Sequence, residues 1–187
     1  MPRQVFEYDA PERFVAGTTG QPGARTFFLQ ARVGPRVTTV QLEKQQVSVL
    51  AERVDELLDE VVRRTGGQAP VPALTPADVE DTGPLDVPIE EEFRVGTMSL
   101  GWDSDVERVV IECFEAGEGS GEEEELADTD EEASGAVLRV WLTGATARAF
   151  AKRALAVVAA GRPPCPFCSG PLDPDGHICP RANGYRR

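Results

Sequence analysis

Three of the four cysteines and the only histidine of this 187-residue chain lie close together near its end. They are Cys165, Cys168, His177 and Cys179. Thiolates and imidazoles are the ligands that structural zinc prefers, and such a site takes four of them in a tetrahedron. Two cysteines separated by two residues reach one ion through a tight turn, and ligands two residues apart share one side of an extended chain. The spacing therefore predicts a closed Cys3His zinc knuckle in which zinc is a structural cofactor.

Three other interpretations of the cluster remain open. A CPFC motif also occurs in dithiol redox centres, but that chemistry needs a helix N-terminus to lower a thiol pKa, and Ser169-Gly170-Pro171 argues against a helix there. Iron bound by four cysteines would require Cys113, which is most simply a small buried residue of a predicted strand. The thiols could also be free and clustered by chance. Asp173 and Asp175 are candidate hydrogen-bond partners of the histidine, or ordinary turn residues.

The chain before the cluster divides into two halves joined by a proline-rich linker. In the first half, strand-like runs flank Gly34-Pro35, and apolar residues then recur at helical spacing from Val47 to Val61. In the second half, strands are predicted over residues 93–102, 108–114 and 136–142, and a helix over 146–160. The predicted organisation is a first β-β-β-α repeat over 1–67, a linker over 68–91, a second repeat over 92–162 and a zinc-binding tail over 163–187.

Two local matches indicate that the halves are copies, although any two strand-to-helix units share part of such a pattern. FVAGT at residues 14–18 matches FRVGT at 93–97, and VTTVQL at 37–42 matches VLRVWL at 137–142. The offset grows from 79 to 100, as one insertion over residues 115–135 would produce. We therefore expect an α+β fold of two pseudo-symmetric units, each laying its helix on an antiparallel sheet.

The formal net charge of -13 comes largely from one segment. Residues 115–135 hold ten acids and no base, whereas the rest of the chain is close to balanced. Such a run cannot bury enough apolar surface to offset the entropy of ordering it, so we expect a mobile, solvated loop. It could also contact a basic partner or shield a basic groove of this protein.

The C-terminal part of the chain is basic, with eight bases and two acids from residue 136 onward. Five of these bases are candidate anion-binding side chains beside the zinc knuckle: Arg148, Lys152, Arg153, Arg181 and Arg186. The alternative is that these bases are solvated and pair with the acidic loop of the same chain.

The sequence offers few groups for catalysis. The histidine is assigned to the metal, so no Ser-His or Cys-His pair can form, and the glycine motifs that bind phosphate or dinucleotides are absent. Asp103 and Asp105 could hold a divalent cation, although this pattern is also a common turn. We expect a zinc-bearing, non-enzymatic interaction, adaptor or regulatory protein whose partner is another protein. The alternative is a metal-dependent enzyme that acts on a phosphorylated or nucleic-acid substrate.

The charge and hydropathy patterns also bear on partners and compartment. Nucleic-acid binding through the basic tail is disfavoured by the acidic charge of the whole chain. The first residues lack the apolar stretch of a secretory signal, and no apolar run is long enough to span a membrane. We therefore expect a cytoplasmic protein without membrane contact, whose cysteines bind metal in a reducing environment.

Three stretches of the sequence resemble a known family. They are MPRQVFEYDAPERFVAGTTGQPGARTFFLQAR, LEKQQVSVLAERVDELLDEV and CPFCSGPLDPDGHICPRANGYRR. The chain is similar over its whole length to an uncharacterised actinobacterial family, a domain of unknown function whose members are sometimes labelled repeat proteins. The resemblance implies a cytoplasmic bacterial protein and carries no activity, substrate or catalytic residues.

Overall fold

The protein is described by a computed structural model that covers residues 3–117, 135–172 and 176–181. The acidic loop expected over 115–135 lies almost entirely outside these residues, as do Asp173, Asp175 and Arg186.

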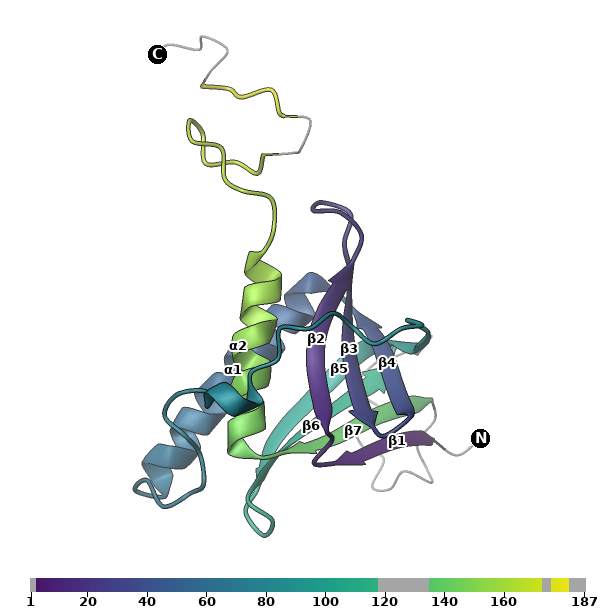
Figure 1. Cartoon of the computed structure of the whole chain (residues 1–187), viewed down its shortest axis with the longest axis vertical. Helices are drawn as coiled ribbons and strands as arrows, with labels where there is room; N and C mark the ends of the chain where they lie inside the picture. Colours follow the sequence, from purple (N-terminus) through teal and green to yellow (C-terminus); the bar gives the residue numbers. More distant parts are fainter. Residues whose placement is uncertain (1–2, 118–134, 173–175, 182–187) are drawn as a thin grey trace.

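The body of the protein is one curved sheet with two long helices against one of its faces (Figure 1). The strands are β1 (Gln4–Asp9), β2 (Arg13–Thr19), β3 (Thr26–Val33), β4 (Arg36–Leu42), β5 (Glu91–Asp103), β6 (Arg108–Glu115) and β7 (Ala136–Leu142). The helices are α1 (Lys44–Arg64) and α2 (Gly144–Ala159), with a short 3-10 turn η1 (Ala77–Val79) between them in the chain. The predicted α+β class is confirmed. Among the described residues, no helix has the length and apolar character needed to cross a membrane.

The seven strands lie in the order β1-β7-β6-β5-β4-β3-β2. Most neighbours are antiparallel, but β1 pairs with β7, and β4 with β5, in parallel. The expectation of an antiparallel sheet is therefore wrong at these two places. Strands β4 and β5 can run in parallel because α1 and the long linker lie between them in the chain. This connection carries the chain from the end of β4 back to the edge of the sheet from which β4 set out. Strand β1 was not predicted at all, and it adds the second parallel pair.

The sheet curls, because β1 and β2 are separated by only three residues yet stand at opposite ends of the strand order. Ala10, in this connection, has a φ of 45°, a backbone conformation that makes a sharp turn. The curl brings β1 against β4. The hydroxyl of Tyr8 lies 2.8 Å from that of Thr38, and the guanidinium of Arg36 lies 4.1 Å from the centre of the Tyr8 ring. Side chains of β1 and β4, which are not neighbours in the strand order, thus meet inside the curve.

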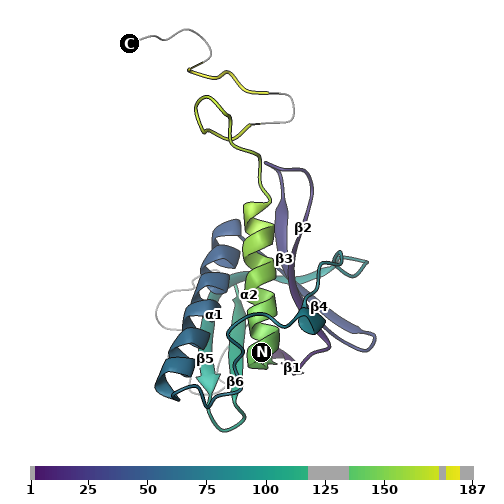
Figure 2. The same ribbon diagram turned by 60° about the vertical axis from the view of Figure 1, so that its left-hand side comes forward.

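One hydrophobic core fills the space between the helices and the inner face of the sheet. The two helices lie side by side in Figure 2 and contact each other along their length. Helix α1 contributes large residues such as Leu50 and Leu58, whereas α2 contributes Ala147, Ala151 and other small residues. The small side chains allow close helix packing, while Phe150 of α2 reaches the sheet. Both halves of the chain contribute to the same core.

The outer face of the sheet is covered in the first half by part of the linker, which we call the strap (residues 81–89). Figure 1 shows this segment crossing β2, β3 and β4 after η1. Leu85 is 8% exposed and packs on Val15 and Phe28. Gly17 makes room for it, since a Cβ at that position would stand 2.6 Å from the Leu85 side chain. The linker is therefore a packed part of the body.

Polar contacts fix the strap as well. The buried amide of Gln30 accepts a hydrogen bond from the backbone N–H of Asp86 at 2.7 Å and donates to its carbonyl at 3.1 Å. The carboxylate of Asp86 accepts from Arg13 at 3.0 Å and lies 3.4 Å from Arg32. Gln30 thus pairs with the strap backbone much as a neighbouring strand would.

We predict opposite outcomes for two glycine substitutions in the sheet. Gly17→Ala should lower the free energy of unfolding by about 1–3 kcal/mol, because Leu85 must leave its site. Gly101→Ala should leave it unchanged or raise it by up to about 1 kcal/mol, since a Cβ at Gly101 meets no described atom within 4 Å. Urea unfolding of both variants measures the difference. Equal destabilisation would contradict the described packing of the strap.

Candidate metal centre

The tail that follows α2 begins with a short hairpin that places the first two cysteines. The backbone N–H of Cys165 donates to the carbonyl of Gly170 at 2.7 Å, and the N–H of Ser169 donates to the carbonyl of Cys165 at 2.8 Å. Ser169 has a φ of 60°, in the left-handed region that closes such a turn. The hairpin holds Cys168 on the same side as Cys165, which is the knuckle geometry that the spacing predicted.

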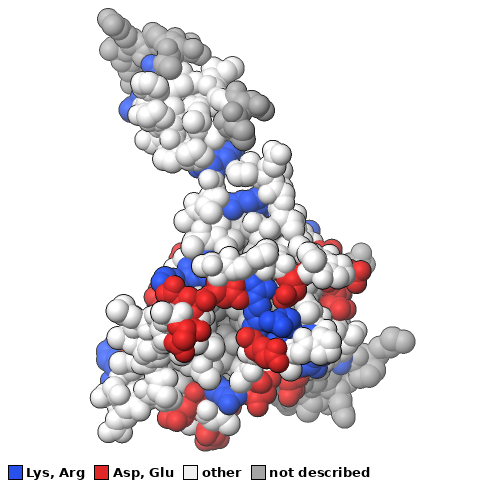
Figure 3. All heavy atoms as spheres, in the orientation of Figure 1, with Lys and Arg blue, Asp and Glu red and all other residues white. Residues whose placement is uncertain are grey.

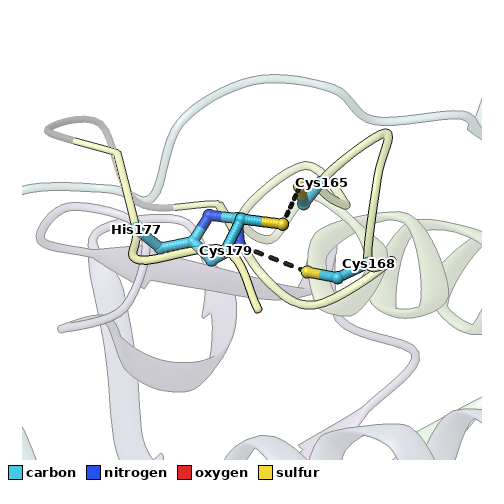
Figure 4. Close-up of side chains that lie close together, drawn as sticks. All are labelled: Cys165, Cys168, His177 and Cys179. Atoms are coloured by element: carbon cyan, nitrogen blue, oxygen red, sulfur yellow. Dashed lines mark hydrogen bonds between the residues drawn. The ribbon is translucent and has the colours of Figure 1, made fainter. Parts of the chain in front are cut away.

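The structure brings the four predicted ligands together (Figure 4). Their ligating atoms all lie within 4.8 Å of one another. The sulfurs of Cys165 and Cys179 are 3.9 Å apart, and the sulfur of Cys168 lies 3.2 Å from Nε2 of His177. In a zinc tetrahedron with Zn–S bonds of about 2.3 Å, ligand sulfurs stand roughly 3.8 Å apart. The cluster therefore has the composition and size to hold one metal ion.

Backbone groups around the cluster favour thiolate formation at Cys165. The pKa of this thiol is lowered, because the backbone N–H groups of Cys168 and Phe167 donate toward its sulfur. The Phe167 nitrogen lies 3.4 Å from the sulfur. A metal binds the thiolate form of cysteine. A CPFC turn that stabilises the Cys165 thiolate therefore agrees with a ligand role for this residue.

The two nitrogens of His177 have different surroundings. Nε2 faces the sulfur of Cys168, whereas Nδ1 is buried and has no hydrogen-bond partner among the described residues. A metal-binding histidine usually donates its other N–H to a carboxylate, a carbonyl or water. The expected partners Asp173 and Asp175 lie outside the described residues, so their role stays a prediction.

The fourth cysteine, Cys113, is not part of the cluster. It lies in β6, is fully buried in the core, and burial together with the charge of Glu112 raises its pKa to about 12. An iron site of four cysteines would need this residue and therefore has no support in the structure. The dithiol alternative also lacks its helix, because residues 166–168 of the CPFC motif form a turn and Gly170 a bend in the described part of the tail.

Arg148 of α2, a candidate anion-binding residue, forms ion pairs with α1. Its side chain is 8% exposed and donates to the carboxylates of Asp55 and Asp59, each at 2.5 Å, and to the carbonyl of Pro72 at 3.2 Å. Because its donors are directed at α1 and the linker, Arg148 serves first to hold α2 in place.

Two neighbouring bases of α2 also have partners within the protein. Lys152 lies 2.5 Å from Glu80. Arg153 donates to the carboxylate of Asp81 at 2.7 Å and to the carbonyl of Ala16 at 2.8 Å. Arg13 binds the same carboxylate and lowers the pKa of Asp81. Figure 3 accordingly shows acidic and basic side chains intermixed on the body.

Arg181 is placed in the tail with the metal ligands. It donates to the carbonyl of Phe167 at 3.1 Å and so ties the end of the described tail to the CPFC turn. Arg181 therefore contacts the CPFC turn, whereas the three bases of α2 contact α1, the linker and β2. Anion binding by these residues and by Arg186 stays a prediction.

A groove runs between α2 and the linker and bears on the alternative of a metal-dependent enzyme. It contains cavities of about 240 and 320 Å³ that share Asp81 and Arg153 among their walls. These two side chains are bonded to each other. Asp103, which the sequence offered with Asp105 as a cation ligand, accepts the N–H of Asp105 at 2.9 Å and caps the β5–β6 turn. In the described ranges, the one group of three or more candidate metal ligands is the tail cluster.

The fold and site define an α+β protein whose C-terminal tail carries a Cys3His cluster suited to a metal ion. A family model described as Protein of unknown function (DUF3090) matches residues 6–179, and the chain belongs to this family. The matched range includes all four cluster residues, and it confirms the family resemblance seen in the sequence. Neither the curated proteins nor the solved structures gave a match.

We predict a stepwise exposure of thiols. Without metal, Cys165, Cys168 and Cys179 should react with a chromogenic disulfide reagent at pH 8, giving three thiols per chain. Cys113 should react only after denaturation, because it is fully buried and its pKa is about 12. Metal-loaded protein should react far more slowly than protein treated with a chelator. Four reactive thiols in the native protein would contradict this description of the core.

Proposed function

We propose that the tail holds one structural zinc ion through Cys165, Cys168, His177 and Cys179. The donor set supports zinc, because thiolate and imidazole ligands in a tetrahedron are its usual structural site. The four ligating atoms lie within 4.8 Å of one another, which suits this coordination. Four protein ligands fill a tetrahedral shell, so the ion would organise the tail rather than bind a substrate.

The zinc would supply the folding free energy of the tail. Large apolar residues of the tail such as Phe167 and Ile178 are 63% and 84% exposed, so they contribute little to a core. The buried side chains of the tail include the ligands Cys165 and Cys179 themselves. A segment of this kind folds when its metal binds, and the binding free energy is then its folding free energy.

We infer that the protein is a non-enzymatic interaction or adaptor protein that contacts another protein in a reducing, cytoplasmic compartment. The observation that carries this inference is the position of the two exposed apolar residues. Phe167 lies between the first two ligands and Ile178 between the last two. The metal would thus hold both side chains at the surface, where exposed apolar groups favour contact with a partner. The four free cysteines support a reducing compartment.

Metal analysis tests the zinc site. We expect one zinc per chain in the purified protein and a loss of most of it in Cys165→Ser. Cys113→Ala is the matched control, since it removes the cysteine outside the cluster and should leave the zinc content unchanged. Cobalt substitution should give the strong visible bands of tetrahedral cobalt with thiolate charge transfer. A zinc-free wild-type protein that also fails to bind cobalt would rule out the site.

We further propose that the two halves arose by duplication, and the strand registers support this. Leu29 of β3 pairs with Val40 of β4, and Ile111 of β6 pairs with Val140 of β7. Val40 also pairs with Phe93 of β5 in parallel. In the same way, Val140 pairs in parallel with β1, so that β1 and β2 together correspond to the long strand β5.

This correspondence shifts one of the two sequence matches. Phe93 corresponds to Tyr8 of β1, because each pairs in parallel with the last strand of the other half. The match of FVAGT with FRVGT, which aligned Phe93 with Phe14, is therefore displaced from the structural one. The match of VTTVQL with VLRVWL agrees with the pairing of β4 and β7.

Loop replacement tests the duplication. Strands β3 and β4 are joined by Gly34 and Pro35 alone, whereas residues 116–135 join β6 and β7. Replacing 116–135 with Gly-Pro should preserve the fold and change the free energy of unfolding by no more than about 1 kcal/mol, because closure entropy depends weakly on loop length. Thermal and urea unfolding measure the effect. Loss of cooperative unfolding would show that the β6–β7 connection is part of the core.

A further inference from the structure

The first and the last cysteine of the metal cluster stand face to face. The sulfurs of Cys165 and Cys179 are 3.9 Å apart, and both residues are buried. The sulfur of Cys168 lies 3.2 Å from Nε2 of His177. Figure 4 marks these two contacts with dashed lines. The cluster thus contains a thiol–thiol contact and a thiol–imidazole contact.

The thiol–thiol contact is close to the geometry of a disulfide. An S–S bond is about 2.05 Å long, so the sulfurs of Cys165 and Cys179 would have to approach by roughly 2 Å. The segment that carries Cys179 is tied to the CPFC turn by the exposed side chain of Arg181, which donates to the carbonyl of Phe167. Without a packed core to hold it, this segment can make so small a movement once the metal is lost.

The reactive form of sulfur is also present in the cluster. A cysteine that binds zinc does so as a thiolate, and the thiolate is the form that attacks an oxidant. The backbone N–H of Phe167 donates to the sulfur of Cys165 across 3.4 Å, which stabilises negative charge there. Cys113 is fully buried in β6, outside the cluster, and has no part in this chemistry.

We propose that Cys165 and Cys179 form an oxidation-sensitive switch, in which a hydroperoxide converts the two thiolates to a disulfide and the tail releases its metal. The proposal rests on the zinc site proposed above and adds its regulation. Cys168 and His177 alone would remain as ligands, too few for a closed structural site. The switch differs from a dithiol catalytic centre, which would use both cysteines of the CPFC motif.

The chemistry balances with hydrogen peroxide as the oxidant. The thiolate of Cys165 attacks one peroxide oxygen and becomes a sulfenic acid, while the O–O bond breaks and the released hydroxide takes up a proton to form water. The thiolate of Cys179 then attacks the sulfenic sulfur, so that the S–S bond forms, the S–O bond breaks and a second hydroxide leaves as water. The two sulfurs lose two electrons in total, and the peroxide accepts them. A dithiol reductant reverses the change by thiol–disulfide exchange.

The switch would act on the tail and leave the body folded, because the core of the body contains none of the metal ligands. The first hairpin of the tail keeps backbone bonds of its own, such as the one from the N–H of Leu172 to the carbonyl of Pro163 at 2.9 Å. Ile178 stands between His177 and Cys179, so release of the histidine removes one of its two anchors. Peroxide would thereby change the apolar surface that the tail presents to a partner.

Peroxide treatment of the zinc-loaded full chain tests the proposal. We expect one zinc released per chain, followed with a chromogenic chelator. Reactive thiols, counted after chelation without denaturant, should fall from three per chain to one. Alkylation and mass spectrometry should place the remaining thiol at Cys168. Cleavage before Asp173 and Asp175 separates the CPFC hairpin from Cys179, so the disulfide should link the two fragments.

Two controls accompany this experiment. Cys113→Ala should behave as the wild type, since it removes the cysteine outside the cluster. Dithiothreitol followed by zinc should restore the metal content and all three thiols. Zinc content measured before the peroxide separates the two proposals, because protein that never binds zinc contradicts the zinc site itself.

Each other outcome overturns the switch. Protein that holds one zinc and keeps both the metal and its three thiols under peroxide would leave the zinc site standing without regulation. A disulfide between Cys165 and Cys168, or between two chains on a non-reducing gel, would show that Cys165 and Cys179 are not the pair. Sulfinic or sulfonic acid without a disulfide would indicate irreversible damage instead of a switch.

Discussion

A seven-stranded sheet has two faces, and the need to cover both is the constraint on which the rest of this structure depends. The two helices and the curl of the sheet bury the inner face in one core. The outer face of the first half is buried by Leu85 of the strap, which requires the bare backbone of Gly17 and the amide of Gln30. The second half has no described strap at Gly101 and carries the Glu112–Arg139 pair on its outer face instead. The linker is thus a structural element, and the described parts of the two halves differ in what covers their outer faces.

Arginine side chains keep these layers together. Arg13, Arg148 and Arg153 have side chains no more than 13% exposed, and each donates both to a carboxylate and to a backbone carbonyl of the linker or of β2. A planar guanidinium with several fixed donors can satisfy such a mixed set of acceptors, which an ammonium group cannot do as well. Removing one partner of a buried pair leaves an uncompensated charge, so these contacts favour one arrangement of helix, linker and sheet. Two of these residues, Arg148 and Arg153, were predicted from the sequence alone to belong to a basic, anion-binding surface.

The features that could be predicted from the sequence are those that depend on the spacing of residues close together in the chain. The four cluster residues lie within fifteen positions, and α1 follows directly from apolar residues at helical spacing. Strand β1 was missed because only Tyr8 of its six residues is fully buried, and the parallel partner β7 is more than 100 residues away. Likewise, the strap was interpreted as a linker because the burial of Leu85 depends on Gly17, far away in the chain. Arg148 could not be assigned either, since its acids lie on the other helix. In each case the deciding contact joins distant segments.

The body and the tail obtain their stability from different sources, and this separation bears on how the protein could act. The body has a large apolar core, whereas the hydrogen bonds that shape the tail join its own residues around the metal ligands. Pro163 and Pro164 connect the two parts and restrict the backbone between them. Gain or loss of zinc would therefore change the presentation of Phe167 and Ile178 without unfolding the body, whose core contains none of the metal ligands.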